Sequence, residues 1–302
     1  MAEEDGKMNQ FTPEMLMGLI SSRRETFTKM MEDIKDQDYQ VIDLREEAGF
    51  TARLAIKKAL PGKRGMFIVC AGGGFLFKSW NEALPVAEFF YDQGVNVSIL
   101  DYHVNEPGAG LAVSGSPGMR MAGEDGLQAI RYLRANAEEL GIDPEHIAIG
   151  GFSAGGMLTG YASTKFDYGD PEAEDPLKRV SSRPDAALIL YGAFSSTTGM
   201  PAGPGGMTRQ QIADAVDMDP IRNIRTDCPP MFVFQTHEDD PRIALYFCYE
   251  LAVHGVPYEV HTFERGPHGC GLYNGKDETP DEPHTAMWAG IAADWLKMHG
   301  FC

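Results

Sequence analysis

The sequence contains a serine in the setting that serine nucleophiles require. The pattern G-F-S-A-G runs from Gly151 to Gly155, follows the apolar run I-A-I and precedes a helix-like segment. In a sharp strand-to-helix turn the residues two before and two after the serine must be small, and the two glycines meet that need. Such a turn lifts the hydroxyl of Ser153 into a cleft. The pattern therefore predicts Ser153 as a nucleophile, against the alternative of a glycine-rich turn with an incidental serine.

A serine hydroxyl is inert until a base takes its proton, and the chain offers eight histidines. His268 lies in G-P-H-G-C-G-L, a loop after the strand-like segment Y-E-V-H-T-F. Flanking glycines favour an exposed loop that can turn its imidazole into a cleft, so His268 is the predicted base. His103 follows another strand-like run and could line the cleft without being the base.

The base in turn needs a carboxylate that fixes its tautomer and stabilises its charged form. The segment T-H-E-D-D-P-R-I offers Glu238, Asp239 and Asp240. The order serine, aspartate, histidine along the chain fits one known arrangement of such triads. We predict Asp240 as the acid, because Pro-Arg-Ile follows it and starts the next helix. Asp239 is the alternative, and a merely solvated acidic turn is the third interpretation.

Acyl transfer also needs hydrogen-bond donors for the oxyanion of the tetrahedral intermediate. The pattern G-G-G-F at Gly72 to Phe75 follows the apolar run M-F-I-V-C, and glycines let a backbone turn its amides toward that oxygen. We predict Gly73, Gly74 and Ala154 as the donors. A phosphate-binding loop is the alternative, but no Lys-Ser/Thr follows the glycines and Phe-Leu-Phe does not suit a phosphate.

Strand-like and helix-like segments alternate around these motifs. Two antiparallel strands are expected over 39–44 and 50–56, after one or two helices within 13–34 that cover an edge of the domain. Apolar runs then predict strands buried on both faces, and an apolar stripe predicts a long helix over 122–140. The predicted fold class is α/β, with a mostly parallel sheet and helices on both faces. The later strands are expected at 66–70, 96–100, 147–149, 186–190, 231–234 and 258–263, with a further helix over 79–93.

Two stretches interrupt this alternation, Phe166 to Arg179 and Ser195 to Asp219. Both are interpreted as lid-like insertions on the ligand-binding side of the sheet. We expect one domain over 1–302, in which 1–38 is a helical extension.

Composition excludes several classes of function. The 302 residues carry a formal charge of −18, which disfavours binding to nucleic acid or to an anionic membrane. Five cysteines without a C-x-x-C pair argue against a disulfide framework or a zinc site. The acidic N-terminus does not resemble a secretory signal, and no apolar stretch approaches about 18 residues. We expect a cytoplasmic protein that needs no metal or cofactor.

These motifs together resemble the α/β-hydrolase superfamily, and more closely its esterase branch of acetyl-xylan-esterase-like enzymes and carboxylesterases. The likeness covers most of the chain from about Arg64 and rests on V-C-A-G-G-G-F, I-L-D-Y, the serine turn, T-H-E-D-D-P and G-P-H-G-C-G-L. Ala71 stands where lipase-like relatives have histidine, and Val104 and Met157 also depart from the pattern. The resemblance implies an α/β-hydrolase fold and a serine carboxylesterase for short acyl groups, with acetyl esters on carbohydrates as one substrate class.

Two other functions are compatible with the motifs. A serine peptidase or amidase would keep the same three residues, although peptidases of this fold usually carry a large extra domain. A non-catalytic ligand-binding protein on a hydrolase scaffold would not need an intact set of serine, histidine and aspartate. The expected partner is a small-molecule ester substrate, and homo-oligomers are left open.

Overall fold

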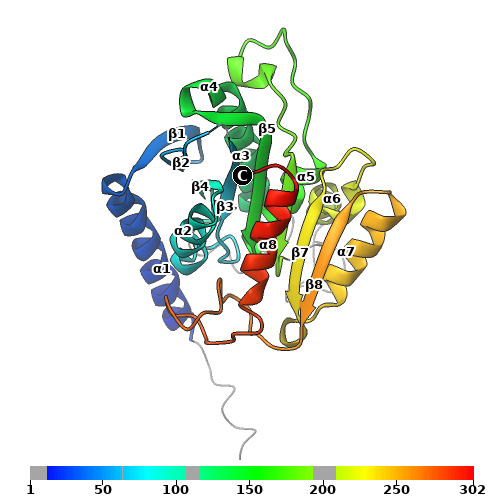
Figure 1. Ribbon diagram of the computed structural model, residues 1–302. Coiled ribbons are helices and arrows are strands. Elements are labelled where there is room, and N and C mark those ends of the chain that lie inside the picture. Colours follow the sequence, from blue (N-terminus) through cyan, green and yellow to red (C-terminus); the bar gives the residue numbers. More distant parts are fainter. Residues whose placement is uncertain (1–11, 63, 107–115, 193–208) are drawn as a thin grey trace, which may run out of the picture.

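A single eight-stranded sheet forms the centre of the computed structural model, which describes residues 12–62, 64–106, 116–192 and 209–302 (Figure 1). The strand order is β1-β2-β4-β3-β5-β6-β7-β8, where β1 and β2 pair antiparallel and the later strands pair parallel to one another. The predicted α/β fold class, with its mostly parallel sheet, is confirmed. The strands are β1 (Tyr39–Glu47), β2 (Phe50–Lys57), β3 (Arg64–Cys70), β4 (Asn96–Asp101), β5 (Ile142–Phe152), β6 (Ala186–Leu190), β7 (Met231–Thr236) and β8 (Tyr258–Phe263).

Helices cover both faces of the sheet, because the strand side chains alternate between two apolar cores. One core joins Ile68 to Leu127 and Phe247, and the other joins Phe67 to Trp288. The first core is covered by α3 (Pro117–Ala135), α5 (Ala154–Thr164) and α7 (Arg242–Val253). The second is covered by α1 (Pro13–Asp33), α2 (Leu84–Asp92) and α8 (Met287–Met298). Shorter helices are α4 (Ala137–Leu140) and α6 (Arg209–Met218).

The predicted insertion at Phe166 to Arg179 does not lie where a lid would be. It follows α5, which has already returned the chain to the amino ends of the parallel strands (Figure 1). There it packs on α3, where Asp167 forms an ion pair with Arg131. The prediction treated the segment as a loop that follows a strand, whereas it connects a helix to a strand. In the second predicted insertion, 195–208 lies outside the described residues and 209–218 forms α6.

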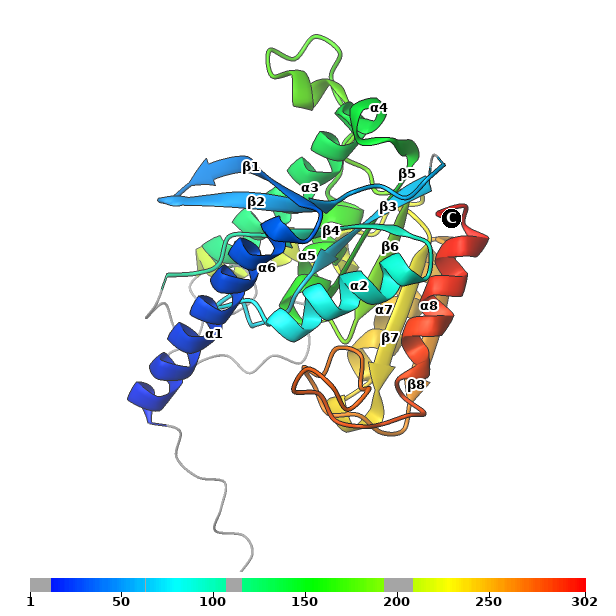
Figure 2. The ribbon, with the colours of Figure 1, turned by 60° about the vertical axis from the view of Figure 1, so that its left-hand side comes forward.

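The N-terminal helix α1 holds two loops that lead away from the carboxyl ends of β3 and β4. Figure 2 shows α1 lying along the β1–β2 side of the sheet, near α2. Arg24 donates from Nε to the carbonyl of Leu76 at 2.7 Å and from Nη2 to the carbonyl of Asn105 at 2.5 Å. One guanidinium therefore connects the predicted edge helix to both loops.

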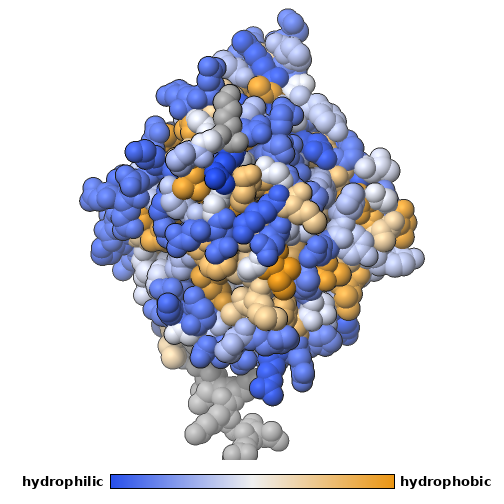
Figure 3. All heavy atoms as spheres, viewed as in Figure 1, coloured by the Kyte–Doolittle hydropathy of each residue, from blue (hydrophilic) through white to orange (hydrophobic). Residues whose placement is uncertain are grey.

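Most of the surface seen in Figure 3 is hydrophilic, with hydrophobic residues over α7 at its right-hand edge. Leu245, Tyr249 and Val253 lie one turn apart along α7 and are 47%, 62% and 60% exposed. No helix within the described residues is both long enough and apolar enough to cross a membrane.

His103 lies inside the fold rather than at a cleft. Its Nδ1 faces Oδ2 of Asp125 at 2.7 Å, and its Nε2 faces the carbonyl oxygens of Glu47 and Phe50 at 2.9 and 3.0 Å. All three partners are acceptors, so both ring nitrogens must carry hydrogen. Burial opposes the charged ring, but the hydrogen bond and charge of Asp125 outweigh it and raise the pKa of His103. A buried imidazolium thus attaches the β1–β2 hairpin to α3.

We predict that His103→Gln destabilises the protein most at mildly acidic pH. Because the native pKa is raised, the stabilisation by the imidazolium is complete below about pH 6.5, the unfolded value, and is lost as pH rises through the native value. Urea unfolding of wild type and variant over a pH series measures this difference. A free-energy difference that stays constant with pH would contradict the charged assignment.

Candidate active site

Ser153 lies at a strained backbone turn between β5 and α5. Its φ is 51°, a left-handed value that residues with a side chain rarely adopt. A Cβ on Gly151 would lie 2.6 Å from the carbonyl oxygen of Cys70 and 2.5 Å from the carbonyl of Gly155, and a Cβ on Gly155 would collide with that same oxygen of Cys70. The glycines are therefore required by the close approach of β3, as the pattern predicted. The turn places Ser153 at the carboxyl end of the sheet.

His268 lies in the loop after β8, at the same carboxyl end of the sheet as Ser153. Hydrogen bonds from side chains hold the backbone of this loop. Thr236 donates its hydroxyl to the carbonyl of Gly266 at 2.6 Å, and the Gly266 amide donates to Oε2 of Glu238 at 2.9 Å. Tyr273 donates its hydroxyl to the carbonyl of Pro267 at 2.7 Å. These bonds lie directly before His268, so its backbone is positioned although its side chain is 46% exposed.

Three side chains from distant parts of the chain form a continuous hydrogen-bonded relay. Nε2 of His268 lies 2.8 Å from Oγ of Ser153, and Nδ1 lies 2.6 Å from Oδ2 of Asp239. Burial works against the charged ring, but the hydrogen bond and charge of Asp239 outweigh it and raise the pKa of His268, with a further contribution from Glu82. The arrangement can move a proton from a hydroxyl to an imidazole whose charged form is stabilised.

The prediction that Asp240 contacts the histidine is wrong, and Asp239 takes that place. A short 3-10 turn over His237–Asp239 follows β7, and Asp240 then adopts a positive φ of 47°, which turns its side chain away. Its carboxylate pairs with Arg242 at 2.6 Å and accepts the amide of Arg242 at 3.2 Å, at the start of α7. This ion pair lowers the pKa of Asp240 to about 2. Asp240 therefore pairs with the first residue of α7 and not with His268.

The predicted donors Gly73, Gly74 and Ala154 lie in two segments that adjoin Ser153. Gly73 and Gly74 have φ values of 134° and 61°, and a Cβ on Gly73 would collide with the carbonyl oxygen of Phe77. Ala154 is the first residue of α5, where an amide has no partner within the helix. A Cβ on the neighbouring Gly72 would lie 2.9 Å from the Cβ of Ser153, so the glycine loop passes beside Ser153.

Two buried residues near the relay were not identified from the sequence. Glu82, in the 3-10 helix Trp80–Glu82, accepts the amide of Gly72 at 2.7 Å. Tyr191, directly after β6, donates its hydroxyl to the same carboxylate at 2.5 Å. No sequence pattern marks either residue, because a lone carboxylate and a lone tyrosine have no characteristic spacing.

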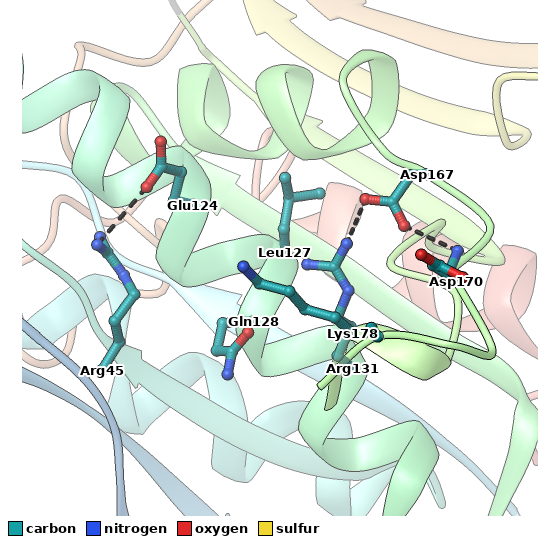
Figure 4. A pocket seen from close by; sticks show the side chains of 10 residues that line it. Arg45, Glu124, Leu127, Gln128, Arg131, Asp167, Asp170 and Lys178 are labelled. Atoms are coloured by element: carbon teal, nitrogen blue, oxygen red, sulfur yellow. Dashed lines mark hydrogen bonds and ion pairs between the residues drawn. The ribbon is translucent and has the colours of Figure 1, made fainter. Parts of the chain in front are cut away.

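A cavity of about 750 Å³ lies away from this relay, outside α3 and against the 166–179 segment (Figure 4). Two ion pairs lie within its wall, as Figure 4 shows for Arg45 with Glu124 at 3.5 Å and for Arg131 with Asp167. Within the described residues no three His, Cys, Asp or Glu side chains are grouped so as to hold a metal ion. The lining residues are Arg45, Glu124, Leu127, Gln128, Arg131, Asp167, Gly169, Asp170, Ala173 and Lys178.

The amino-acid sequence is similar to a family model and to several known proteins. A family model described as BD-FAE matches residues 56–185. The chain is 28% identical over 223 residues to the endo-1,4-beta-xylanase B of Butyrivibrio fibrisolvens, a match that covers 70% of this chain and 33% of that protein. It is also 28% identical over 127 residues to the probable carboxylic ester hydrolase LipM of Mycobacterium tuberculosis, covering 38% of this chain and 29% of LipM. The chain thus spans about a third of the length of these curated relatives.

A solved structure extends the likeness over nearly the whole fold. The acetyl ester-xyloside bifunctional hydrolase of Caldicellulosiruptor lactoaceticus aligns with a TM-score of 0.72 at 27% identity, covering 87% of this chain and 97% of that one. The sheet order and the serine turn define an α/β-hydrolase fold. The chain thus has the α/β-hydrolase fold, and the proteins that it resembles in sequence and structure include esterases of this fold.

We predict that Asp239→Asn lowers the pKa of His268, because it removes the hydrogen-bonded charge that favours the imidazolium. Titration of the ring protons of His268 by NMR measures the value. Asp240→Asn is the matched control and leaves this titration unchanged, since Asp240 faces Arg242. An equal shift in both variants would contradict the assignment.

Proposed function

We propose that the chain is a serine ester hydrolase in which Ser153, His268 and Asp239 form the catalytic triad. The observation that supports this most strongly is the relay itself, with contacts of 2.8 and 2.6 Å on the two sides of one imidazole. Neutral His268 takes the proton of Ser153 as the hydroxyl attacks the ester carbonyl, and Asp239 stabilises the resulting imidazolium. Asp239 replaces Asp240 in this scheme because only Asp239 reaches the ring.

The proposed reaction has two halves joined by an acyl-enzyme. The tetrahedral oxyanion is held by the backbone amides of Gly73, Gly74 and Ala154, next to the amino end of α5. His268 then returns its proton to the leaving alcohol, and the acyl group stays on Oγ of Ser153. Water repeats the attack with His268 again as the base, and the acid leaves. Each step uses groups of this chain and water.

We propose short acyl esters as the substrate class, with acetyl groups on carbohydrates as the leading candidate. Two relatives support this by their printed names, one a xylanase and the other an acetyl ester-xyloside hydrolase. The charge of −18 also favours neutral esters over polyanionic substrates.

A series of p-nitrophenyl esters from acetate to longer acyl chains, together with acetylated xylo-oligosaccharide, tests the substrate class. We expect the highest kcat/KM with acetate and release of acetate from the sugar. An aminoacyl anilide tests for peptidase activity in parallel. Faster cleavage of the anilide, or a preference for long chains, would overturn the proposed class.

We predict that Ser153→Ala abolishes ester turnover and also labelling by a fluorophosphonate probe, because both require Oγ as nucleophile. The matched control is Ser181→Ala at the opposite end of the sheet, where Oγ contacts the carbonyl of Asp167. This control retains turnover and labelling. Residual activity of Ser153→Ala near the wild-type level would refute the nucleophile, and a wild type that is neither labelled nor active would favour a binding protein.

We predict that Asp239→Asn lowers kcat by about 10⁴-fold, since the amide cannot stabilise the imidazolium or hold the required tautomer. Asp240→Asn keeps kcat within a few-fold of wild type, because it removes only an exposed ion pair at the start of α7. Steady-state kinetics with p-nitrophenyl acetate measures both. The reverse ranking of the two variants would contradict the proposed triad.

A further inference from the structure

A second carboxylate lies behind the site, and its two oxygens hold two different loops. Glu82 is 1% exposed. Its Oε2 accepts the amide of Gly72 in the glycine loop at 2.7 Å, and its Oε1 accepts the hydroxyl of Tyr191 at 2.5 Å. Burying a carboxylate costs free energy unless hydrogen-bond donors replace the lost water. A carboxylate as buried as that of Glu82 is therefore unexpected unless it has a specific role.

Tyr191 continues the connection to the histidine loop. Its hydroxyl accepts the amide of Gly271 at 2.9 Å, three residues after His268. Its ring lies edge to face with the imidazole of His268, with centroids 5.0 Å apart. Trp288 supports the same loop, because its indole donates to the carbonyl of Gly271 at 3.1 Å. One chain of hydrogen bonds therefore runs from Gly72 through Glu82 and Tyr191 to Gly271.

We propose that Glu82 is a positioning residue that couples the oxyanion loop to the histidine loop and whose negative charge stabilises the imidazolium of His268. The inference rests on the proposed function, because it assigns the imidazolium a place in the reaction. Asp239 acts on His268 through a direct hydrogen bond, whereas Glu82 acts through Tyr191 and through its field. The buried setting strengthens that field, since little water screens it.

Both oxygens of Glu82 have donors within the core, which is the geometric support for a charged carboxylate. Burial raises the pKa of Glu82 overall, and the bonds from Tyr191 and Gly72 and the charge of His268 offset part of that shift. Such donors are how a buried carboxylate is held in its charged form. The other titratable and charged groups that face Glu82 or His268 are Arg23, Tyr102, Asp239, Cys270 and Tyr273.

Glu82→Gln tests the charge with almost no change in size. The amide can satisfy one of the two donors but not both, and it carries no charge. We expect kcat for p-nitrophenyl acetate to fall roughly 10- to 100-fold, as small misplacement of catalytic groups does, with KM little changed. We also expect the acid limb of the pH–rate profile to move to lower pH, because His268 loses a stabilising negative charge. NMR titration of His268 reports the same shift independently of activity.

Tyr191→Phe tests the hydrogen-bonded connection between the two loops and leaves the carboxylate of Glu82 in place. It keeps the carboxylate and its bond to Gly72 but removes the hydroxyl that links Glu82 to Gly271. We expect a lower kcat, with the acid limb moving less than in Glu82→Gln, because Gly72 still donates to the carboxylate. The control for loss of a paired carboxylate is Asp185→Asn at the opposite end of the sheet, where the partly buried carboxylate pairs with Arg134 at 2.6 Å. This control loses stability but retains kcat and the acid limb.

The outcomes distinguish this inference from the proposed function. A wild type inert toward every ester would refute the proposed function and, with it, the reaction role of Glu82. An active wild type with Glu82→Gln unchanged in kcat and in the titration of His268 would refute only the role of Glu82. A loss of kcat without any shift in the titration would reduce Glu82 to a structural residue. Where Glu82→Gln does not fold, a wild-type kcat in Tyr191→Phe overturns the coupling.

Discussion

The whole site depends on one reversal of the backbone, at Ser153. A left-handed φ in a residue with a side chain costs about 1–3 kcal/mol, so the surrounding structure must enforce it. Gly151 and Gly155 make this possible by letting β3 and α5 approach so closely that no Cβ fits between them. The same closeness brings the glycine loop after β3 beside the nucleophile. A single packing constraint thus positions both Ser153, the proposed nucleophile, and the glycine loop that holds the proposed oxyanion donors.

Around that turn, charge is distributed on two sides of His268. Asp239 stands in a partly exposed turn and bonds the ring directly, while Glu82 is sealed in the core and acts over a distance. The exposed carboxylate is easily solvated, and the buried one needs Gly72 and Tyr191 to compensate it. The loops that carry these donors are therefore held in place by the same bonds that keep the carboxylate charged.

Features that repeat along the chain could be predicted from sequence, and those set by one local turn could not. Apolar runs predicted the strands, and glycine spacing predicted Ser153 correctly at its turn. Asp239 and Asp240 differ only in the backbone angle of a short turn, which no periodicity records, so the preference for Asp240 failed. The segment 166–179 was assigned to the wrong end of the sheet, because the prediction did not take into account that α5 returns the chain to the amino ends of the strands. Glu82 was overlooked because a lone carboxylate in an apolar segment has no pattern.

The 166–179 segment lies far enough from the candidate active site to change without affecting it. Its contacts are with α3, with the connection into β6, and with Arg225 and Asp227 before β7, at the end of the molecule remote from Ser153. Insertions, deletions or charge changes there leave the reacting groups where they are. A change in this segment would therefore alter the surface at one end of the molecule and leave the contacts of Ser153 and His268 at the other end in place.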